Sequence, residues 1–501
     1  MQERLTTSSI FHSKQTWLLF SLYASIRILS YFLAGNVIAQ AGIVFLVVSI
    51  MGLVFFKNPD HAWMMVVGEL ILGGSGHFFE FYGLSLRTIL ILVFLFLWII
   101  YIIANRFERE THILPHKLFY LIIVFFGFLA VSVVTGLFNN HSVTAIIQDF
   151  IPFAFLLLVH PAYHLFSQDH MRHYLVRLII VFLIGSALFS LFTYILFVSG
   201  TAELQGPLYH WFRDIAVGKI TEVTTYYYRI VLAENLLITP ILLVISSLLM
   251  RDEKHHKMWR VLFLCGAVIL ALNFSRAYLL AFAVGLLFLK YKHKVLRWFI
   301  VSAWSVAMIV LIFMSILIIS SKGKSFGFEI IGIRISSLIQ PITETSSNIR
   351  MALLEPIETL ILQHPIIGNG LGSTFTYIDP RTYTEVTTSQ FDWGYLEMWA
   401  ELGIGGALCL LTIVGFLIYE LIKKIRSISD YHDLYVGLLG GVIALLVMNI
   451  TSPALYHVLG IFFLTFIIAF ASKADGLFDE TVTLLYRVFN RLKVHPDSKL
   501  R

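Results

Sequence analysis

The chain has 501 residues and a formal net charge of +6, with 58% hydrophobic and only 13% charged residues. A soluble domain carries about 25% charged residues, so the composition excludes a large soluble domain and predicts a polytopic membrane protein. The positive charge does not indicate affinity for nucleic acid, because basic residues gather in the cytoplasmic loops of membrane proteins. Cys265 and Cys409 lie in apolar runs without CxxC spacing, so we expect neither a disulfide framework nor a cysteine metal site. We also expect no cofactor.

Apolar stretches recur along the whole chain, and each is long enough to cross roughly 30 Å of hydrocarbon. Continuous apolar runs indicate helices, because the strands of a membrane barrel alternate polar and apolar residues. We therefore predict an all-α transmembrane bundle of about 14 helices that forms one integral membrane domain over 1–501. The predicted segments are 16–34, 37–55, 61–75, 85–104, 118–138, 144–160, 175–199, 230–250, 260–274, 277–289, 298–320, 395–419, 434–450 and 453–471.

The basic residues predict the orientation of these segments. With fourteen crossings and both termini in the cytoplasm, every cluster of lysine and arginine falls on the cytoplasmic side. The clusters are Arg106, Arg109 and Lys117; Arg251, Lys254, Lys257 and Arg260; Lys290, Lys292, Lys294 and Arg297; Lys423, Lys424 and Arg426; and the basic residues of the tail 472–501. Thr481 to Arg491 of this tail fits an interfacial amphipathic helix and a solvated helix about equally well.

Two long connections and one tight break then fall on the outer side. The connections are 200–229 and the much larger loop 321–394, and the break is Ser275–Arg276. In the large loop we expect amphipathic helices, the first capped by Ser346 or Ser347, interrupted by Pro356 and ending at His364. The glycines at 368, 370 and 372 are expected to form a plain flexible turn rather than a phosphate-binding loop, because no strand precedes them.

Arginines on the outer side are candidate ligands for phosphate. Arg213, Arg229, Arg276, Arg334, Arg350 and Arg381 fall there. A guanidinium binds phosphate oxygens in bidentate fashion and stays charged, although an outer arginine is more often an anchor at the membrane surface. Arg276 and Arg350 are the strongest candidates, since they lie at breaks rather than at ordinary helix ends.

Several short motifs in a fixed order resemble those of the bacterial O-antigen ligase and O-antigen polymerase superfamily. The motifs cover roughly 230–406 and are Ser275-Arg276, Asn348-Ile349-Arg350, Pro365-Ile366-Ile367-Gly368-Asn369-Gly370, Asp392-Trp393-Gly394-Tyr395-Leu396 and Leu402-Gly403-Ile404-Gly405-Gly406. The resemblance implies a metal-independent, inverting glycosyltransferase that uses an undecaprenyl-diphosphate-linked glycan. It assigns the diphosphate to Arg276 and Arg350, and substrate binding to Ser275, Arg229, Arg334 and Tyr395.

One position departs from the ligase pattern. Where ligases have a histidine, this chain has Asp392, which is more similar to some polysaccharide polymerases. Asp392 is therefore the candidate catalytic base, with the alternative that it caps the helix that begins near Tyr395. Glu397 and Glu401 are interpreted as charges at the start of that helix.

The resulting hypothesis is a polymerase of lipid-linked repeat units in the bacterial inner membrane, with its site on the extracytoplasmic side. Its partners would be a polyprenyl-diphosphate-linked oligosaccharide, membrane lipids, and chain-length regulator or flippase proteins. The first alternative is a ligase that moves the finished glycan to another acceptor. The second is a transporter or flippase of a lipid-linked sugar, for which Arg27, Glu69, Asp149 and Glu234 would supply charges within the membrane.

Overall fold

The computed structural model describes residues 14–104, 116–165, 169–251, 257–291, 293–332, 345–427 and 432–471. Most of these residues are helical. The helices are α2 (Lys14–Phe32), α3 (Val37–Lys57), α4 (Pro59–Leu72), α5 (Leu86–Ala104), α6 (His116–Phe138), α7 (Val143–Ala154), η1 (Phe155–Leu158), α8 (Val159–Leu165), α9 (Asp169–Val198), α10 (Pro207–Asp214), η2 (Ala233–Leu237), α11 (Ile238–Leu249), α12 (Lys257–Asn273), α13 (Arg276–Phe288), α14 (Val295–Ser320), α16 (Thr345–Gln363), α17 (Gly394–Arg426), α18 (His432–Met448) and α19 (Val458–Ala471). The tail 472–501, with its expected amphipathic or solvated helix, and the candidate Arg334 lie outside the described residues.

The helices make this an integral membrane protein. Seven described segments are long and apolar enough to cross a membrane, namely Val37–Lys57, Leu86–Ala104, Lys117–Phe138, Val143–Leu165, His173–Val198, Val295–Ser320 and Gly394–Arg426. Each of the fourteen predicted apolar segments falls on a helical stretch. Some of these helices are shorter than a full span, so the number of crossings and the side of the termini stay predictions.

The prediction of an all-α fold needs one correction, because three antiparallel hairpins accompany the helices. They pair β1 (Glu80–Phe81) with β2 (Leu84–Ser85), β3 (Lys219–Thr224) with β4 (Tyr227–Val231), and β5 (Phe375–Ile378) with β6 (Glu385–Thr388). The second and third hairpins are rich in threonine, valine, isoleucine and tyrosine, which favour strands. Such short strands alternate polar and apolar residues, so they contain no long apolar run by which the sequence would indicate them.

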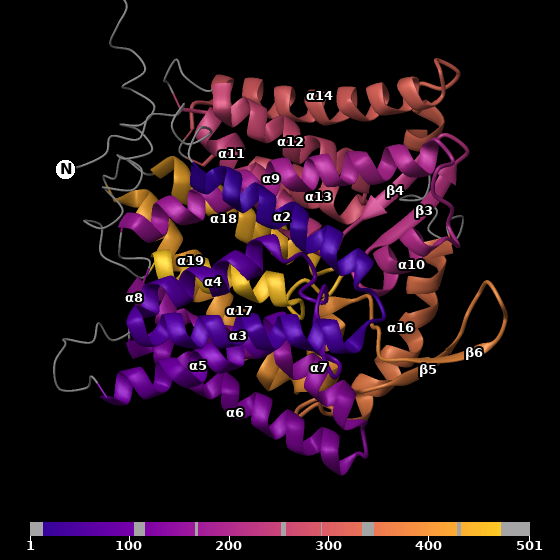
Figure 1. The fold of residues 1–501 in the computed structure, drawn as a ribbon. Coiled ribbons are helices and arrows are strands. Elements are labelled where there is room, and N and C mark those ends of the chain that lie inside the picture. The colour runs from indigo at the N-terminus through magenta and orange to yellow at the C-terminus, as the bar shows by residue number, and fades with distance from the viewer. Residues whose placement is uncertain are drawn as a thin grey trace, which may run out of the picture.

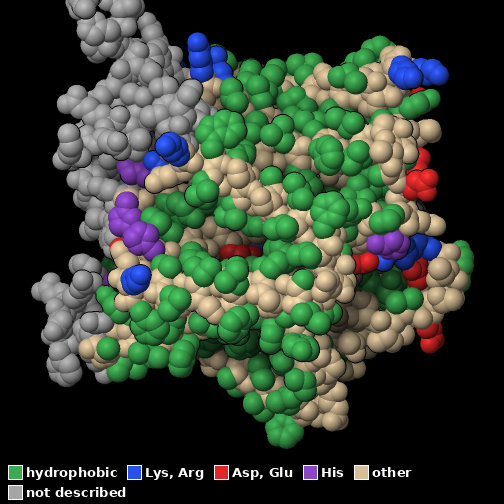
Figure 2. All heavy atoms as spheres, in the orientation of Figure 1, with side chains coloured by type: hydrophobic (Ala, Val, Ile, Leu, Met, Phe, Trp, Pro, Cys, Tyr) green, Lys and Arg blue, Asp and Glu red, His purple; other side chains and the backbone are tan. Residues whose placement is uncertain are grey.

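The long helices run side by side, and the connecting elements gather at one end of the bundle (Figure 1). This hairpin end carries α10, the β3–β4 hairpin, α16 and the β5–β6 hairpin, and α16 lies across the direction of the long helices. The helix directions place Lys257, Lys290, Lys294, Lys423 and Arg426 at the opposite end. Between the two ends the visible surface is a broad apolar belt (Figure 2).

The centre of the bundle is built where α11 packs against α18 and α13. Glycines allow this close approach: a Cβ atom on Gly437 would lie 2.7 Å from Cα of Val244, and one on Gly285 would lie 2.3 Å from Cδ1 of Leu243. Small residues at helix contacts are typical of membrane bundles, in which packing rather than water drives association.

Two further apolar clusters fasten the hairpin end to the bundle. The β3–β4 hairpin and α10 pack on the first cluster, which we call the outer aromatic cluster. It contains Trp211, Phe212, Tyr227, Phe274 and Phe313. The other contains one face of α16, formed by Leu353, Ile357 and Ile361 at four-residue spacing, which meets Phe375, Phe391 and Ala400. The described parts of the two long connections, 200–229 and 321–394, therefore pack against the helical bundle.

Candidate active site

The break between α12 and α13 is a strained turn that presents Arg276. Phe274 has a φ of +40°, which is unfavourable for a residue with a side chain, and its ring stacks on Phe313 with a centroid distance of 4.2 Å. Ser275 precedes the helix, but its side chain does not cap it. Strain of this kind costs about 1–3 kcal/mol and is often found at functional sites.

Arg276 connects this break to the start of α16. One of its terminal nitrogens donates a hydrogen bond of 2.7 Å to the hydroxyl of Ser347. The expectation that Ser346 or Ser347 caps α16 is wrong, because the helix already begins at Thr345. The Ser347 hydroxyl instead orients the Arg276 guanidinium, three residues before Arg350 on the same helix.

Arg350 in turn faces Asp392, the residue proposed as base. Nε of Arg350 lies 3.7 Å from a carboxylate oxygen of Asp392, and the two side chains are 29% and 44% exposed. This distance is too long for a hydrogen bond, and Nε is buried without a hydrogen-bond partner. The indole of Trp393 donates to the backbone oxygen of Arg350 at 2.9 Å and holds the two segments together.

The backbone of Asp392 excludes the alternative that its side chain caps α17. The helix begins at Gly394, so the cap position belongs to Trp393, and no side chain caps this end. Asp392 itself has a φ of +57°, a region that aspartate tolerates better than most residues. Its carboxylate is therefore presented beside Arg350 rather than used by the helix.

The β3–β4 hairpin adds two cations that come from another part of the chain. Arg229 on β4 donates a 2.7 Å hydrogen bond to the backbone oxygen of Asn273, immediately before the strained turn. Partial burial and then the charge of Arg229 lower the pKa of the Lys219 ammonium; Arg381 and Arg350 act in the same direction, and Asp392 opposes them. Lys219 therefore lies close enough to the site to interact with its charges. The sequence alone did not show whether Lys219 belongs to the site.

Two other basic candidates are already neutralised by neighbouring acids. Arg381 binds both carboxylate oxygens of Asp379, with a shortest contact of 2.6 Å. Arg213 pairs with Asp214 at 2.7 Å. Tyr395, proposed to bind substrate, donates its hydroxyl to the backbone oxygen of Leu446 at 2.8 Å and is held against α18.

The glycine turn after α16 is packed into the bundle, so the prediction of a flexible turn is wrong. A Cβ on Gly368 would lie 2.4 Å from the backbone oxygen of Glu401, and one on Gly370 would lie 2.2 Å from the backbone nitrogen of Gly136. The turn fits against a kink in α17 at Gly403, whose φ and ψ are 67° and 175°. The glycine turn at 368–372 and the glycine-rich segment at 403–406 of α17 therefore pack directly against each other.

Glu397 and Glu401 were interpreted as charges at a helix start, but both are buried. Glu401 accepts a hydrogen bond from the backbone nitrogen of Ser373 at 3.2 Å, and Asp149 accepts one from Gly372 at 2.9 Å. The two carboxyl groups also lie within hydrogen-bonding reach of each other. Glu401 and Asp149 therefore anchor the glycine turn. The sequence around each acid does not predict this role, because the hydrogen-bond donors lie far away in the chain.

One group among the described residues could hold a metal ion, formed by His293, His432 and Asp433. It lies at the end of the bundle opposite the hairpins, and Asp433 is paired there with Arg251 at 3.2 Å. The arginines at the hairpin end are cationic and offer no metal ligands, so their chemistry is that of anion binding.

Residues 261–411 match the family model for O-antigen ligase. This match confirms the resemblance to the O-antigen ligase and polymerase superfamily, whose members are glycosyltransferase-like enzymes acting on lipid-linked glycans in the membrane. A comparison with curated proteins finds no match for the chain.

The matched segment contains most of the site that the structure assembles. The matched residues run from α12 into α17 and include Arg276, Arg350, the glycine turn and Asp392. Lys219 and Arg229 lie before the matched segment. The β3–β4 hairpin therefore adds, from outside the matched segment, two cations to a site whose other members lie within that segment.

Proposed function

We propose that this protein is a membrane glycosyltransferase that polymerises lipid-diphosphate-linked glycan repeat units. The hairpin end would face the extracytoplasmic side and the basic opposite end the cytoplasm, as the distribution of lysine and arginine favours. The observation that carries the proposal is the convergence of Arg276, Arg350 and Asp392 from three separate segments, through the Arg276–Ser347 and Arg350–Asp392 contacts.

In the proposed reaction, a hydroxyl of the acceptor glycan attacks the anomeric carbon of the donor sugar. The bond between that carbon and the diphosphate oxygen breaks, and the diphosphate leaves with its electron pair on the lipid carrier. Asp392 accepts the proton of the attacking hydroxyl, and attack from the face opposite the leaving group inverts the anomeric carbon. Arg276 and Arg350 stabilise the charge that develops on the diphosphate, and no metal ion is needed.

The electrostatics of the site support a diphosphate ligand. Partial burial and then the charges of Arg229, Arg381 and Arg350 lower the pKa of Lys219, and Asp392 is the acid that opposes them, whereas Asp379 and Asp214 are occupied by their own arginines. The site therefore has a surplus of positive charge, and a ligand with several negative oxygens would relieve it.

A polymerase is favoured over a ligase because Asp392 stands where ligases have a histidine. A transporter is less well supported, because the charges that it would need are engaged with each other or with the fold. Arg27 pairs with Glu234 at 2.9 Å, Glu69 pairs with Arg87 at 2.8 Å, and Asp149 holds the glycine turn.

The test compares glycan products in cells that lack the native gene and express wild type, Arg276→Ala, Arg350→Ala or Asp392→Asn, with membrane levels checked for each. Loss of one arginine is expected to slow polymerisation roughly 10²–10³-fold, and loss of the base roughly 10²–10⁴-fold. Lipid-linked single repeats should then accumulate. Arg213→Ala is the matched control, because its partner Asp214 lies on the same short helix.

The products also decide between the alternatives. A ladder of increasing repeat number in wild type supports a polymerase, whereas transfer of an already finished chain to a different acceptor supports a ligase. Wild-type output from all three expressed site variants would refute the assignment of the site.

A further inference from the structure

A cavity of about 830 Å³ opens on the flank of the bundle near the hairpin end. Its walls are α2 and α9, and its roof is formed by α10 and the segment 201–206. The lip consists of exposed apolar side chains, among them Ile28, Phe32, Leu188 and Phe192. Because such side chains form the apolar belt of the surface (Figure 2), the cavity is open to the hydrocarbon of the bilayer.

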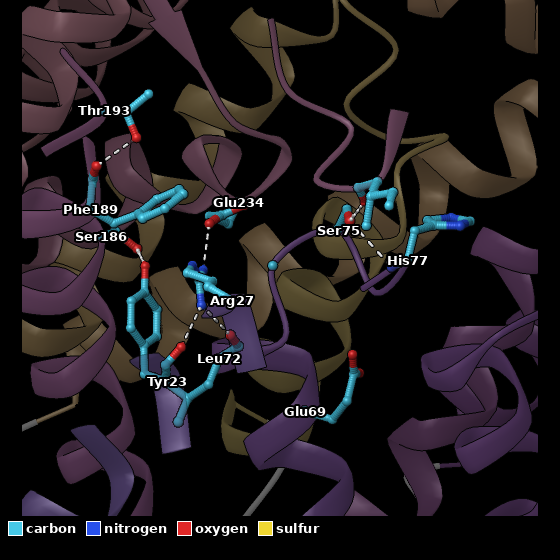
Figure 3. Close-up of polar contacts among 12 residues, drawn as sticks. Tyr23, Arg27, Glu69, Leu72, Ser75, His77, Ser186, Phe189, Thr193 and Glu234 are labelled. Carbon is cyan, nitrogen blue, oxygen red and sulfur yellow. Dashed lines mark hydrogen bonds and ion pairs between the residues drawn. The ribbon is translucent and has the colours of Figure 1, made fainter. Parts of the chain in front are cut away.

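Arg27 lines the cavity, and it forms a buried ion pair with Glu234 (Figure 3). The two side chains are only 4% and 2% exposed and meet at 2.9 Å. Arg27 also donates to the backbone oxygens of Tyr23 and Leu72, and its guanidinium carbon lies 3.5 Å from the centre of the Tyr23 ring. Glu234 neutralises the charge of Arg27, so Arg27 does not make the cavity an anion site.

The lining favours a branched, unsaturated chain as the occupant. Seven of the nineteen lining residues are aromatic, and their ring faces suit the double bonds and methyl branches of isoprene units. The volume lies within the range of specific ligand pockets, about 300–1,000 Å³.

The position of the cavity separates its occupant from the donor site. Trp211 lines the cavity and belongs to the outer aromatic cluster, which also contains Phe274, the neighbour of Ser275–Arg276. A lipid whose diphosphate lies on Arg276 and Arg350 is thus divided from the cavity by packed side chains. The chain continues from α10 directly to Lys219 on β3, so the head group of a second lipid would emerge beside the catalytic site.

We propose that this cavity holds the isoprenoid chain of the acceptor lipid. The inference rests on the proposed function, because a polymerase must hold two lipid carriers at once. Arg276 and Arg350 would bind the donor, and the α2–α9 cavity would bind the acceptor by its hydrocarbon chain.

The test fills the cavity with a large side chain. Leu188→Trp places an indole in it, and Ile195→Trp is the matched control, because both residues lie on α9 with 60% and 59% exposure and only Leu188 lines the cavity. Transfer is measured with a fixed donor and with acceptors that carry one repeat unit on either a geranyl or an undecaprenyl chain. Thermal unfolding of both variants confirms that they fold.

Wild type and Ile195→Trp should have a lower KM for the undecaprenyl acceptor than for the geranyl acceptor. In Leu188→Trp this preference should disappear, with the KM for the undecaprenyl acceptor raised roughly tenfold, the equivalent of about two buried methylene groups. The KM for the donor should not change. An unaltered chain-length preference in Leu188→Trp would overturn the proposal.

A second measurement does not depend on catalysis. A polyprenyl monophosphate with a diazirine in its chain is photocrosslinked to wild type, and the sites are mapped by mass spectrometry. Crosslinks on α2 and α9 that Leu188→Trp abolishes support the cavity even if wild type transfers no glycan, in which case only the proposed function fails. The absence of crosslinks on α2 and α9, or equal labelling of the cavity by a phospholipid diazirine, would contradict the isoprenoid assignment.

Discussion

At the scale of single residues, the site contains backbone angles that are unfavourable and a polar atom that lacks a hydrogen-bond partner. Phe274 and Asp392 both have positive φ angles, and Nε of Arg350 is buried without a hydrogen-bond partner. Unsatisfied groups of this kind are costly in a folded protein. Their concentration around Arg276, Arg350 and Asp392 is what a site prepared for an anionic ligand requires, because the ligand supplies the missing contacts.

Lys219 gives the site a predictable pH dependence. Its pKa is lowered by partial burial and by Arg229, so its ammonium loses its proton at a lower pH than a free lysine does. Donor binding should therefore weaken as the pH rises from neutral into the alkaline range, seen as a rising KM for the donor. In Lys219→Arg the charge persists across this range, so the rise should be absent.

The measurement is the KM for the donor as a function of pH in wild type, Lys219→Arg and Lys219→Ala. Lys219→Ala should bind the donor weakly at every pH, since it has no charge to lose. Superimposable profiles of wild type and Lys219→Arg would exclude Lys219 from the binding of the donor.

At the scale of elements, the contact between the glycine turn and the kink of α17 positions the catalytic groups. The backbone nitrogen of Asn369 bonds to the oxygen of Ala400, and that of Ile404 bonds to the oxygen of Pro365. This contact fixes the end of α16 against α17, and hence Arg350 relative to Asp392. The two glycine motifs of the sequence thus hold α16 and α17 together, which explains why they occur in the same chain.

Gly403→Ala tests this contact. A Cβ at this position would lie 2.2 Å from the backbone oxygen of Ile366, in a residue whose φ is +67°, so neither the backbone nor the neighbour can accommodate it easily. We expect a loss of at least about 1–3 kcal/mol in the free energy of unfolding, measured as a lower thermal unfolding temperature in detergent.

Gly415→Ala on the same helix is the control, because its Cβ would meet nothing within 4 Å. Alanine favours a helix by up to about 1 kcal/mol over glycine, so this variant should be neutral or slightly stabilised. Equal stability of the two variants would contradict the packing described for the glycine turn.

At the scale of the whole molecule, the two ends of the bundle differ in structure and in charge. The hairpin end carries the connecting elements and the site, whereas lysines and arginines flank the helix ends at the opposite end. The asymmetry follows from the insertion of membrane proteins, in which basic loops stay in the cytoplasm. It predicts the side on which the site acts.

Cysteine labelling tests the orientation after Cys265 and Cys409 are replaced by alanine. Glu385→Cys on β6 should react with a membrane-impermeant maleimide in intact spheroplasts, because the hairpin end is expected to face outward. Lys423→Cys near the end of α17 should react only after the membrane is permeabilised. The reverse pattern would place the site on the cytoplasmic side.

The sequence by itself determined what depends on local properties of the chain. Long apolar runs indicated membrane helices, because hydrocarbon demands about 20 apolar residues whatever the neighbours are. Short motifs indicated the superfamily and led to Arg276, Arg350 and Asp392. The hairpins were missed, because their short alternating strands carry little signal until they pair.

Only the tertiary structure decided which of these residues meet. The contact of Arg276 with Ser347, the inclusion of Lys219 in the site, the burial of Glu401 and the α2–α9 cavity all join segments far apart in the chain. Local periodicity predicts the face that a helix buries but not the partner against which it packs. The packing partner of each helix depends on how all the helices fit together. This packing brings the separate motifs together in one site.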